Sequence, residues 1–241
     1  MEVEVSKVPL EKIQELREIS LRENNFQFVH DKCHGAGWAD TYIFLLGADT
    51  VGYGSMWGKD DRQMRDTIFE FYLLRPYRKF ASMIFTKFGI ASGASFIECQ
   101  TNNKLQSELF FEYARNIQVE AILFEDNRQT QLNIPATLFR KNSGENEGPE
   151  YVLEYSGKVV ASGGFVRNYN FPYIDMYYEV DDGQRMKGFG SLFTQELKRE
   201  AYRLKRVPAA RCNIKNHASK ATLLKAGMAI CGHMLIGELV L

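Results

Sequence analysis

The sequence predicts a mixed α/β protein that contains two tandem copies of one order of strands and helices. Its composition, 45% hydrophobic and 25% charged over 241 residues, is ordinary for a globular chain. Apolar runs of strand length alternate with amphipathic runs of helix length. The same order of runs then occurs twice. The length suits one large domain or two small ones.

The duplication is visible when each residue is set beside the one 109 positions further on. A slip of four residues before Cys99 then restores the match. The matching pairs include Tyr42 and Tyr151, Val51 and Val160, Gly54 and Gly163, Glu70 and Glu179, Ser82 and Ser191, Cys99 and Cys212, and Asn103 and Asn216. Self-similarity at a fixed spacing indicates an internal repeat. We therefore expect a first domain at 1–126 and a second at 127–241.

The first half begins with a strand at 1–8, in which valines alternate with charged residues. Leu10, Ile13, Leu16 and Ile19 then form the apolar stripe of a helix that ends near Arg22. A less regular stretch at 24–40 holds a second short helix. Short β-branched and aromatic runs predict strands at 42–46, 51–56, 68–74, 95–101 and 119–124. Helical spacing predicts helices at 76–88 and 105–114.

The second half repeats this order without a clear pair of early helices. A connector occupies 127–149, within which 136–140 has the character of a strand. Further strands are expected at 151–155, 159–166, 173–180, 210–214 and 229–240. Helices are expected at 191–206, where Phe193, Leu197 and Ala201 share one face, and at 218–226. Pro208 is expected to stop the first of these helices.

Residues 179–191 connect a buried strand to a helix and contain three glycines. Such a turn directs backbone N–H groups and the positive end of a helix dipole at one point, which favours an anion. Gly188 and Gly190 allow phosphates to approach the backbone, and Arg185 and Lys187 add cationic donors. The spacing excludes a Walker A loop, because Phe189 follows Gly188, and excludes the dinucleotide fingerprint, because Phe193 replaces its third glycine.

A second motif follows the predicted strand 210–214. Asn216, Ala218 and Ser219 begin a helix that ends with Ala226 and Gly227. Asn216 suits the N-cap and Gly227 the position after the helix. Together with Arg185-x-x-Gly188-x-Gly190, this pattern resembles the GNAT superfamily of N-acetyltransferases. The resemblance covers 151–240 well and 1–126 weakly.

The resemblance implies that each repeat is a splayed mixed sheet flanked by helices, with acyl-CoA bound in the splay of the second repeat. Pro76, Lys79 and Ala81 replace Arg185, Gly188 and Gly190 in the first repeat, which therefore has the features of a degenerate copy with a structural or acceptor-site role. The residues implied for acetyl-CoA are Val180, Arg185, Met186, Lys187, Gly188, Phe189, Gly190, Ser191, Asn216, Ser219 and Lys220.

The implied reaction is direct attack of a primary amine on the thioester, which requires a base because an alkyl ammonium has a pKa of about 10.4. Glu179 stands where many GNAT proteins have such a base, and Tyr178 and Asp175 are reserve candidates. Many family members also have a tyrosine seven residues after the helix asparagine, which protonates the thiolate. That position here is Leu223. The acid is then His217, Tyr177 or Tyr178, or the thiolate leaves unassisted, or activity is lost.

The leading hypothesis is an acetyl-CoA-dependent N-acetyltransferase that acts on a primary amine of a small molecule or peptide. The acceptor is expected in the cleft between the repeats. Four aromatic residues either line that cleft or pack in the core and hairpin: Tyr169, Phe171, Tyr173 and Tyr177. Two alternatives remain. One is a non-catalytic CoA-binding or regulatory module, which Leu223 favours. The other is a tandem transferase with an aminoacyl-tRNA donor.

The charge balance and the cysteines limit the partners. The formal net charge of +0 argues against a nucleic-acid partner. No apolar run approaches the length that spans a membrane, and no secretory signal is present, so a cytoplasmic protein is expected. The four cysteines have no CxxC spacing, and His30, Cys33 and His34 lack a further ligand pair, so no metal is expected. A monomer or homodimer is expected.

Overall fold

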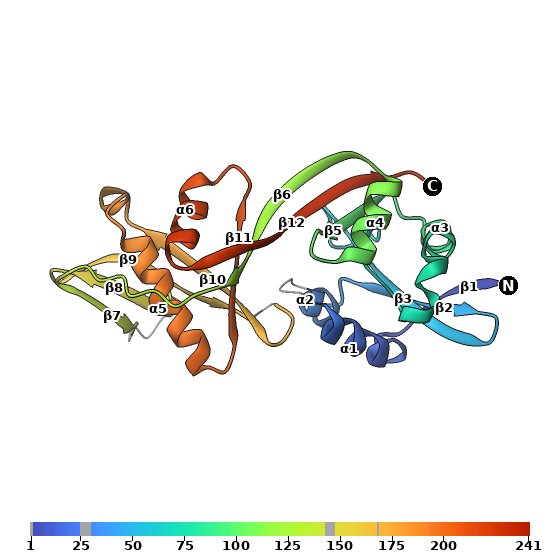
Figure 1. Ribbon diagram of the computed structural model, residues 1–241, viewed down its shortest axis with the longest axis horizontal. Coiled ribbons are helices and arrows are strands. Elements are labelled where there is room, and N and C mark those ends of the chain that lie inside the picture. Colours follow the sequence, from blue (N-terminus) through green and yellow to red (C-terminus); the bar gives the residue numbers. More distant parts are fainter. Residues whose placement is uncertain (1, 25–29, 143–147, 168) are drawn as a thin grey trace. The chain divides into compact units, whose positions relative to one another are not determined.

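The computed structural model describes residues 2–24, 30–142, 148–167 and 169–241 (Figure 1). The chain forms two compact units. Unit 1 consists of Met1–Glu120 and Gly232–Leu241, and unit 2 consists of Ala121–Cys231. Each unit has its own succession of hydrogen-bonded strands and its own helices. The two units are described separately below.

Unit 1 has the strand order β1-β2-β3-β4-β5-β12, in which only the β4–β5 pair is parallel. Its strands are β1 (Val3–Val8), β2 (Asp40–Leu46), β3 (Asp49–Trp57), β4 (Thr67–Leu73), β5 (Phe96–Gln100) and β12 (Met228–Leu239). Its helices are η1 (Leu10–Lys12), α1 (Gln14–Glu23), α2 (His30–Gly35), η2 (Arg75–Phe80), α3 (Ala81–Ser92) and α4 (Lys104–Tyr113).

Unit 2 has the strand order β6-β11-β10-β9-β8-β7, in which only the β10–β11 pair is parallel. Its strands are β6 (Ala114–Asp126), β7 (Thr137–Lys141), β8 (Tyr151–Tyr155), β9 (Lys158–Val166), β10 (Tyr173–Val180) and β11 (Val207–Asn213). Its helices are η3 (Asp182–Gln184), α5 (Phe189–Arg203) and α6 (His217–Lys225). The order β8-β9-β10-η3-α5-β11-α6 repeats β2-β3-β4-η2-α3-β5-α4, so the predicted duplication extends to the fold.

The repeats exchange their last strands. The far end of β6 pairs with β11 in unit 2, from Ala121 opposite Asn213 to Glu125 opposite Ala209. The far end of β12 pairs with β5 in unit 1, at residues 234–238. The sheet of each unit is therefore completed by a strand that follows the last helix of the other repeat. Sequence reasoning did not anticipate this exchange.

Each unit has one main core between its sheet and its helices α3 and α4 or α5 and α6. In unit 1 the largest buried side chains are aromatic, and they include Phe44, Phe71, Phe85, Phe88 and Phe110. In unit 2 α5 contributes Phe189, Leu192, Phe193 and Leu197, and α6 contributes Leu223. Cys99 and Cys212 are buried free thiols.

A buried ionic cluster joins α1 and α2 to the sheet of unit 1. Glu70 on β4 accepts hydrogen bonds from Arg17 Nε at 3.1 Å, Ser55 Oγ at 2.8 Å and His34 Nε2 at 2.8 Å. Arg17 also pairs with Asp31 at 2.7 Å. The side chains of Glu70 and Arg17 are at least nine-tenths buried, so this ion pair is held away from solvent.

Three predicted helices have other bounds in the structure. The first part of the helix expected at 76–88 is a 3-10 helix, η2, and α3 follows it. In the same way, the helix expected at 10–22 consists of a 3-10 helix, η1, followed by α1. Pro208 does not stop the helix expected at 191–206. That helix ends at Arg203, Lys205 has a left-handed φ of 57°, and Pro208 is the second residue of β11. Proline is tolerated there because it lies at the start of a strand.

Candidate functional site

The predicted phosphate-binding turn lies between β10 and α5 in unit 2 (Figure 1). Gly188 is the N-cap of α5 and has a left-handed φ of 88°, a conformation that favours glycine. No side chain caps this helix and no acidic residue lies in its first turn. The first N–H groups of a helix have no partner within it, so those of Phe189, Gly190 and Ser191 are available to an anion.

The two cations of the turn are bonded to the turn itself. Arg185 donates from Nε to the carbonyl of Val180 at 3.3 Å and pairs with Asp182 at 2.6 Å. Lys187 donates to the carbonyl of Gly183 at 3.0 Å and to Gln184 Oε1 at 2.9 Å. Both side chains thereby brace the backbone conformation in which the N–H groups point outward.

A third cation, Lys225, lies beside the helix start. A Cβ placed on Gly188 would lie 3.7 Å from Lys225 Nζ and 3.6 Å from Ile134 Cδ1. Sequence reasoning missed Lys225, because a lysine in the last turn of a helix is already explained by the helix dipole. The signal that could have found it is the spacing of nine residues from Asn216, which fixes its place at the far end of α6.

The strands on either side of the site diverge. β10 pairs with β9 along its length from Asp175 to Val180, but it pairs with β11 only at residues 173–175, opposite 207–209. Beyond Ala209, β11 continues to pair with β6 on its other side as far as Asn213. Within the part of the chain that the structure describes, the β11-facing edge of residues 176–180 has no strand partner. The sheet of unit 2 is thus splayed, as expected.

Tyr178 lies in this divergence, on the side of β10 that faces α5 and α6. Its hydroxyl is 3.3 Å from Ser219 Oγ on α6, and its ring is 3.5 Å from the position of a Cβ on Gly190. Burial raises the pKa of the Tyr178 hydroxyl, and hydrogen bonds to Ser219 and Thr222 oppose that rise. Three residues predicted from separate motifs, Tyr178, Gly190 and Ser219, are therefore brought together.

Other predicted residues have local structural roles around this group. Asn216 is the N-cap of α6 and accepts the backbone N–H of Ser219 at 3.0 Å, and Lys220 is half-buried in the first turn of the same helix. Ser191 donates to the carbonyl of Thr222 at 3.3 Å, which joins α5 to α6. Met186 is 98% exposed at the tip of the turn. Leu223 is buried in the core, so the position of the usual tyrosine offers no hydroxyl.

Glu179 lies on the other face of the sheet. Side chains alternate along a strand, so Asp175, Tyr177 and Glu179 share one face while Tyr178 and Val180 share the other. Glu179 is exposed and stands opposite Ser162 of β9. The two residues predicted to be catalytic, Glu179 and Tyr178, are adjacent in the chain but are not brought together by the structure.

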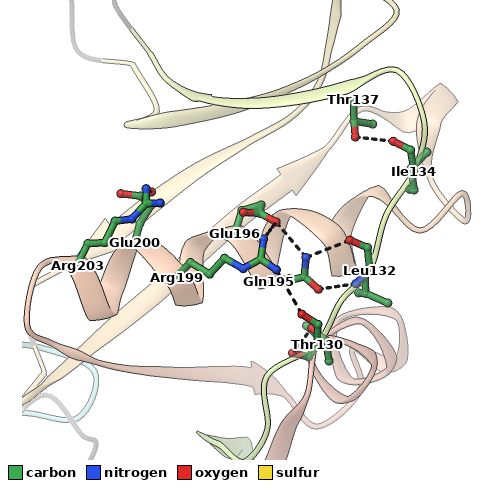
Figure 2. A network of polar contacts seen from close by, with 10 residues as sticks. Thr130, Leu132, Ile134, Thr137, Gln195, Glu196, Arg199, Glu200 and Arg203 are labelled. Atoms are coloured by element: carbon green, nitrogen blue, oxygen red, sulfur yellow. Dashed lines mark hydrogen bonds and ion pairs between the residues drawn. The ribbon is translucent and has the colours of Figure 1, made fainter.

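The connector between the repeats is bound tightly to α5 (Figure 2). Gln195 accepts the N–H of Leu132 at 2.7 Å and donates to its carbonyl at 3.1 Å, and Arg199 donates to the carbonyl of Thr130. Lys198 is buried, pairs with Asp126 at 2.5 Å and donates to the carbonyl of Ala226 at 2.8 Å. These contacts hold the segment that carries Ile134 beside Gly188.

A large hollow lies elsewhere in unit 2. It has a volume of about 770 Å³ and lies between the β7–β8 hairpin and the second half of α5. Its rim carries charged residues that are largely paired on the surface, Glu196 with Arg199 and Glu200 with Arg203 (Figure 2). None of the predicted site residues lines it, so we assign the site by the geometry of the turn and the splay.

Neither a metal group nor a membrane helix is found. Among the described residues, no three histidine, cysteine or acidic side chains are grouped as a metal would require. The side chain of His30 is outside the description, and His34 contacts Glu70. No helix in the described parts of the chain is long and apolar enough to cross a membrane.

Several solved structures match almost the whole chain. An acetyltransferase of the GNAT family from Colwellia psychrerythraea matches at a TM-score of 0.75 and 14% identity, covering 98% of this chain and 99% of its own. A GCN5-related N-acetyltransferase from Sphaerobacter thermophilus matches at a TM-score of 0.62 and 10% identity, covering 98% and 95%. A tandem GNAT protein from the clavulanic acid biosynthesis pathway, solved without acetyl-CoA, matches at 0.61 and 9%, covering 98% of each chain.

No protein-family model matches the sequence, and no curated protein matches it either. The similarity is thus one of fold. The chain has the GNAT fold in two tandem copies, which confirms the resemblance and the fold class predicted from the sequence.

Proposed function

We propose that this protein is an acyl-CoA-dependent N-acyltransferase, with acetyl-CoA as the donor and a primary amine of a small molecule or peptide as the acceptor. The observation that carries the proposal is the uncapped start of α5 beside a splayed strand edge. Such a site offers backbone donors to a pyrophosphate and an extended edge to an amide-containing arm. The fold similarity supports the same class of donor.

The second repeat, 127–241, is proposed to bind the acyl-CoA. The N–H groups of Gly188, Phe189, Gly190 and Ser191 would bind the pyrophosphate, and Arg185, Met186 and Lys187 would complete the turn around it. Val180 would polarise the thioester carbonyl through its backbone N–H. Asn216, Ser219 and Lys220 would flank the arm of the cofactor. The first repeat, 1–126, is proposed to have a structural or acceptor-site role.

In this mechanism the amine nitrogen attacks the thioester carbon, a C–N bond forms and the C–S bond breaks. The nitrogen loses one proton to a base, and the departing thiolate receives one from an acid. We propose Tyr178 as the acid, because its hydroxyl lies in the splay and burial keeps it protonated at neutral pH. Glu179 is the base that the family resemblance suggests.

A non-catalytic CoA-binding module is the second candidate. It is favoured by Leu223, which is buried where many GNAT proteins have the tyrosine acid. It shares the proposed cofactor site and differs only in having no turnover, so one set of experiments distinguishes the two.

The test is calorimetric titration of the wild type with acetyl-CoA, CoA and ATP, repeated with Gly188→Trp. Its matched control is Gly93→Trp, because Gly93 also has a left-handed φ, 67°, and open space around its Cβ position, but lies in unit 1. We expect acetyl-CoA and CoA to bind wild type and Gly93→Trp, and not Gly188→Trp. Turnover with a panel of amines then follows. Binding without turnover on any amine supports the non-catalytic module, and absence of CoA binding by wild type refutes both.

A further inference from the structure

We propose that Asp175, at the point where β10 and β11 separate, takes the proton from the acceptor amine. This inference rests on the proposed function and replaces Glu179 in the role of base. Asp175 is opposite Ala209 in the last register pair between the two strands. The next residues of β10 still pair with β9, but on the edge that faces β11 they have no strand partner among the described residues. Asp175 is therefore the carboxyl group at the closed end of the splay.

The surroundings of Asp175 are polar, built from several elements and partly buried. Tyr169, in the turn before β10, is 2% exposed and hydrogen-bonds to the carboxyl group, as does the backbone N–H of Met176. Arg211 extends from β11 two residues beyond Ala209 and attracts the carboxylate. Glu125 of β6 is in register with Ala209, and Cys231 of β12 acts on Tyr169.

These groups give the carboxyl a titration suited to a base. Burial raises the pKa of Asp175 to about 7, and the attraction of Arg211 and the hydrogen bond from Tyr169 limit the rise. A base is most effective when its pKa lies near the working pH, because it is then both ionised and able to hold a proton. Glu179 is exposed near the outer end of the same strand and has no such enclosure.

Asp175 lies on the face of the sheet that Tyr177 and Glu179 share, in register with the small side chain of Ala209. An ammonium group that approached along this face would transfer one proton to the Asp175 carboxylate. The neutral amine would then attack the thioester carbon, and the thiolate would take a proton from Tyr178 on the opposite face. The acylated nitrogen then loses its second proton to solvent, and the Tyr178 phenolate regains a proton from solvent. Asp175 also releases its proton to solvent, so that an ammonium and a thioester give an amide, a thiol and one proton.

The experiment is the pH profile of kcat/KM for wild type, Asp175→Asn, Asp175→Glu and Glu179→Gln, with acetyl-CoA binding measured for each. Wild type should show an acid limb near pH 7. Asp175→Asn should bind acetyl-CoA normally, lose kcat/KM by about 100-fold or more, and lose that limb. Asp175→Glu should recover part of the rate and regain a limb, which a merely structural role would not produce.

Tyr169→Phe supplies a second reading that does not require loss of the carboxyl group. Removing the hydrogen bond that favours the carboxylate should move the acid limb to higher pH. If Glu179→Gln abolishes the limb while Asp175→Asn retains it, Glu179 is the base and the inference is overturned. If wild type binds acetyl-CoA but acylates no amine, the proposed function fails, and the role of Asp175 fails with it.

Discussion

Glu70 and Glu179 occupy the same position in the two repeats, but their surroundings are opposite. Each lies on the strand that precedes the strand-to-helix turn, and each stands in register with a serine, Ser55 or Ser162. Glu70 is buried against Arg17, Ser55 and His34, whereas Glu179 is exposed. The described residues of the second repeat form no helices equivalent to α1 and α2, from which two of those partners come.

This difference in burial predicts that the same substitution changes the free energy of unfolding much more in the first repeat than in the second. Glu70→Gln should lower the free energy of unfolding by roughly 3 kcal/mol, because it leaves the buried Arg17 without a full counter-charge. Glu179→Gln, its matched control in the other repeat, should change it by less than about 0.5 kcal/mol. Urea denaturation monitored by circular dichroism measures both. Equal effects of the two substitutions would contradict the assignment of Glu70 as a structural group.

Lys225→Gln should weaken acetyl-CoA binding by about tenfold, because a charge-assisted contact to a phosphate contributes on the order of 1.5 kcal/mol. Lys215→Gln, an exposed lysine before α6, is the control and should leave affinity unchanged. Titration at two ionic strengths adds a second reading, since the salt dependence should shrink only in Lys225→Gln. A tenfold loss in both variants would show that overall charge matters, and not the place of Lys225.

Tyr178→Phe should lower kcat by about 10- to 100-fold with little change in acetyl-CoA affinity, because it removes the proposed acid for the thiolate. The deficit should be smallest with a thioester whose thiol is more acidic than that of CoA, since that leaving group needs no proton. Tyr202→Phe, which alters a hydroxyl bonded to Asp126, is the control. An equal deficit with both thioesters would argue against an acid role for Tyr178.

Asp175 should make stability depend on pH. Its pKa is raised from 3.8 to about 7 on folding, so the native state binds more protons than the unfolded chain between those values. The contribution of Asp175 to the free energy of unfolding is full below about pH 4. It decreases as the pH rises to about 7 and does not change further above that pH. Asp175→Asn removes the decline, which amounts to at most about 4 kcal/mol. Urea denaturation of wild type and Asp175→Asn at pH 5 and pH 8 measures this decline. If the two proteins differ in free energy of unfolding by the same amount at both pH values, the prediction is wrong.

Local pattern was sufficient for much of the fold. The bounds of β10, 173–180, follow directly from an apolar aromatic run, and the duplication follows from residues such as Tyr42 and Tyr151. The grouping of Tyr178 with Ser219 and Gly190 is consistent with motifs whose places on a strand, a helix start and a turn are set by nearby residues.

What the sequence did not reveal depends on contacts between distant segments. The strand exchange requires knowing which edge β12 pairs with, and its apolar residues suit either sheet. The place of Lys225 beside Gly188 and the enclosure of Asp175 by Tyr169 and Arg211 arise from tertiary packing. A carboxyl in a strand has an ordinary pKa until its neighbours are known.

The exchange of β6 and β12 also constrains how the protein is made. During synthesis the first repeat emerges with a gap at the edge of β5, since its partner strand comes from residues 234–238. Leu235, which packs in the core of unit 1, is translated more than a hundred residues after Phe110, with which it shares that core. Ribosome-bound intermediates of the first repeat therefore have an exposed strand edge until residues 234–238 have been synthesised. An exposed strand edge is prone to association with other chains. For the same reason, neither half is expected to fold if expressed alone.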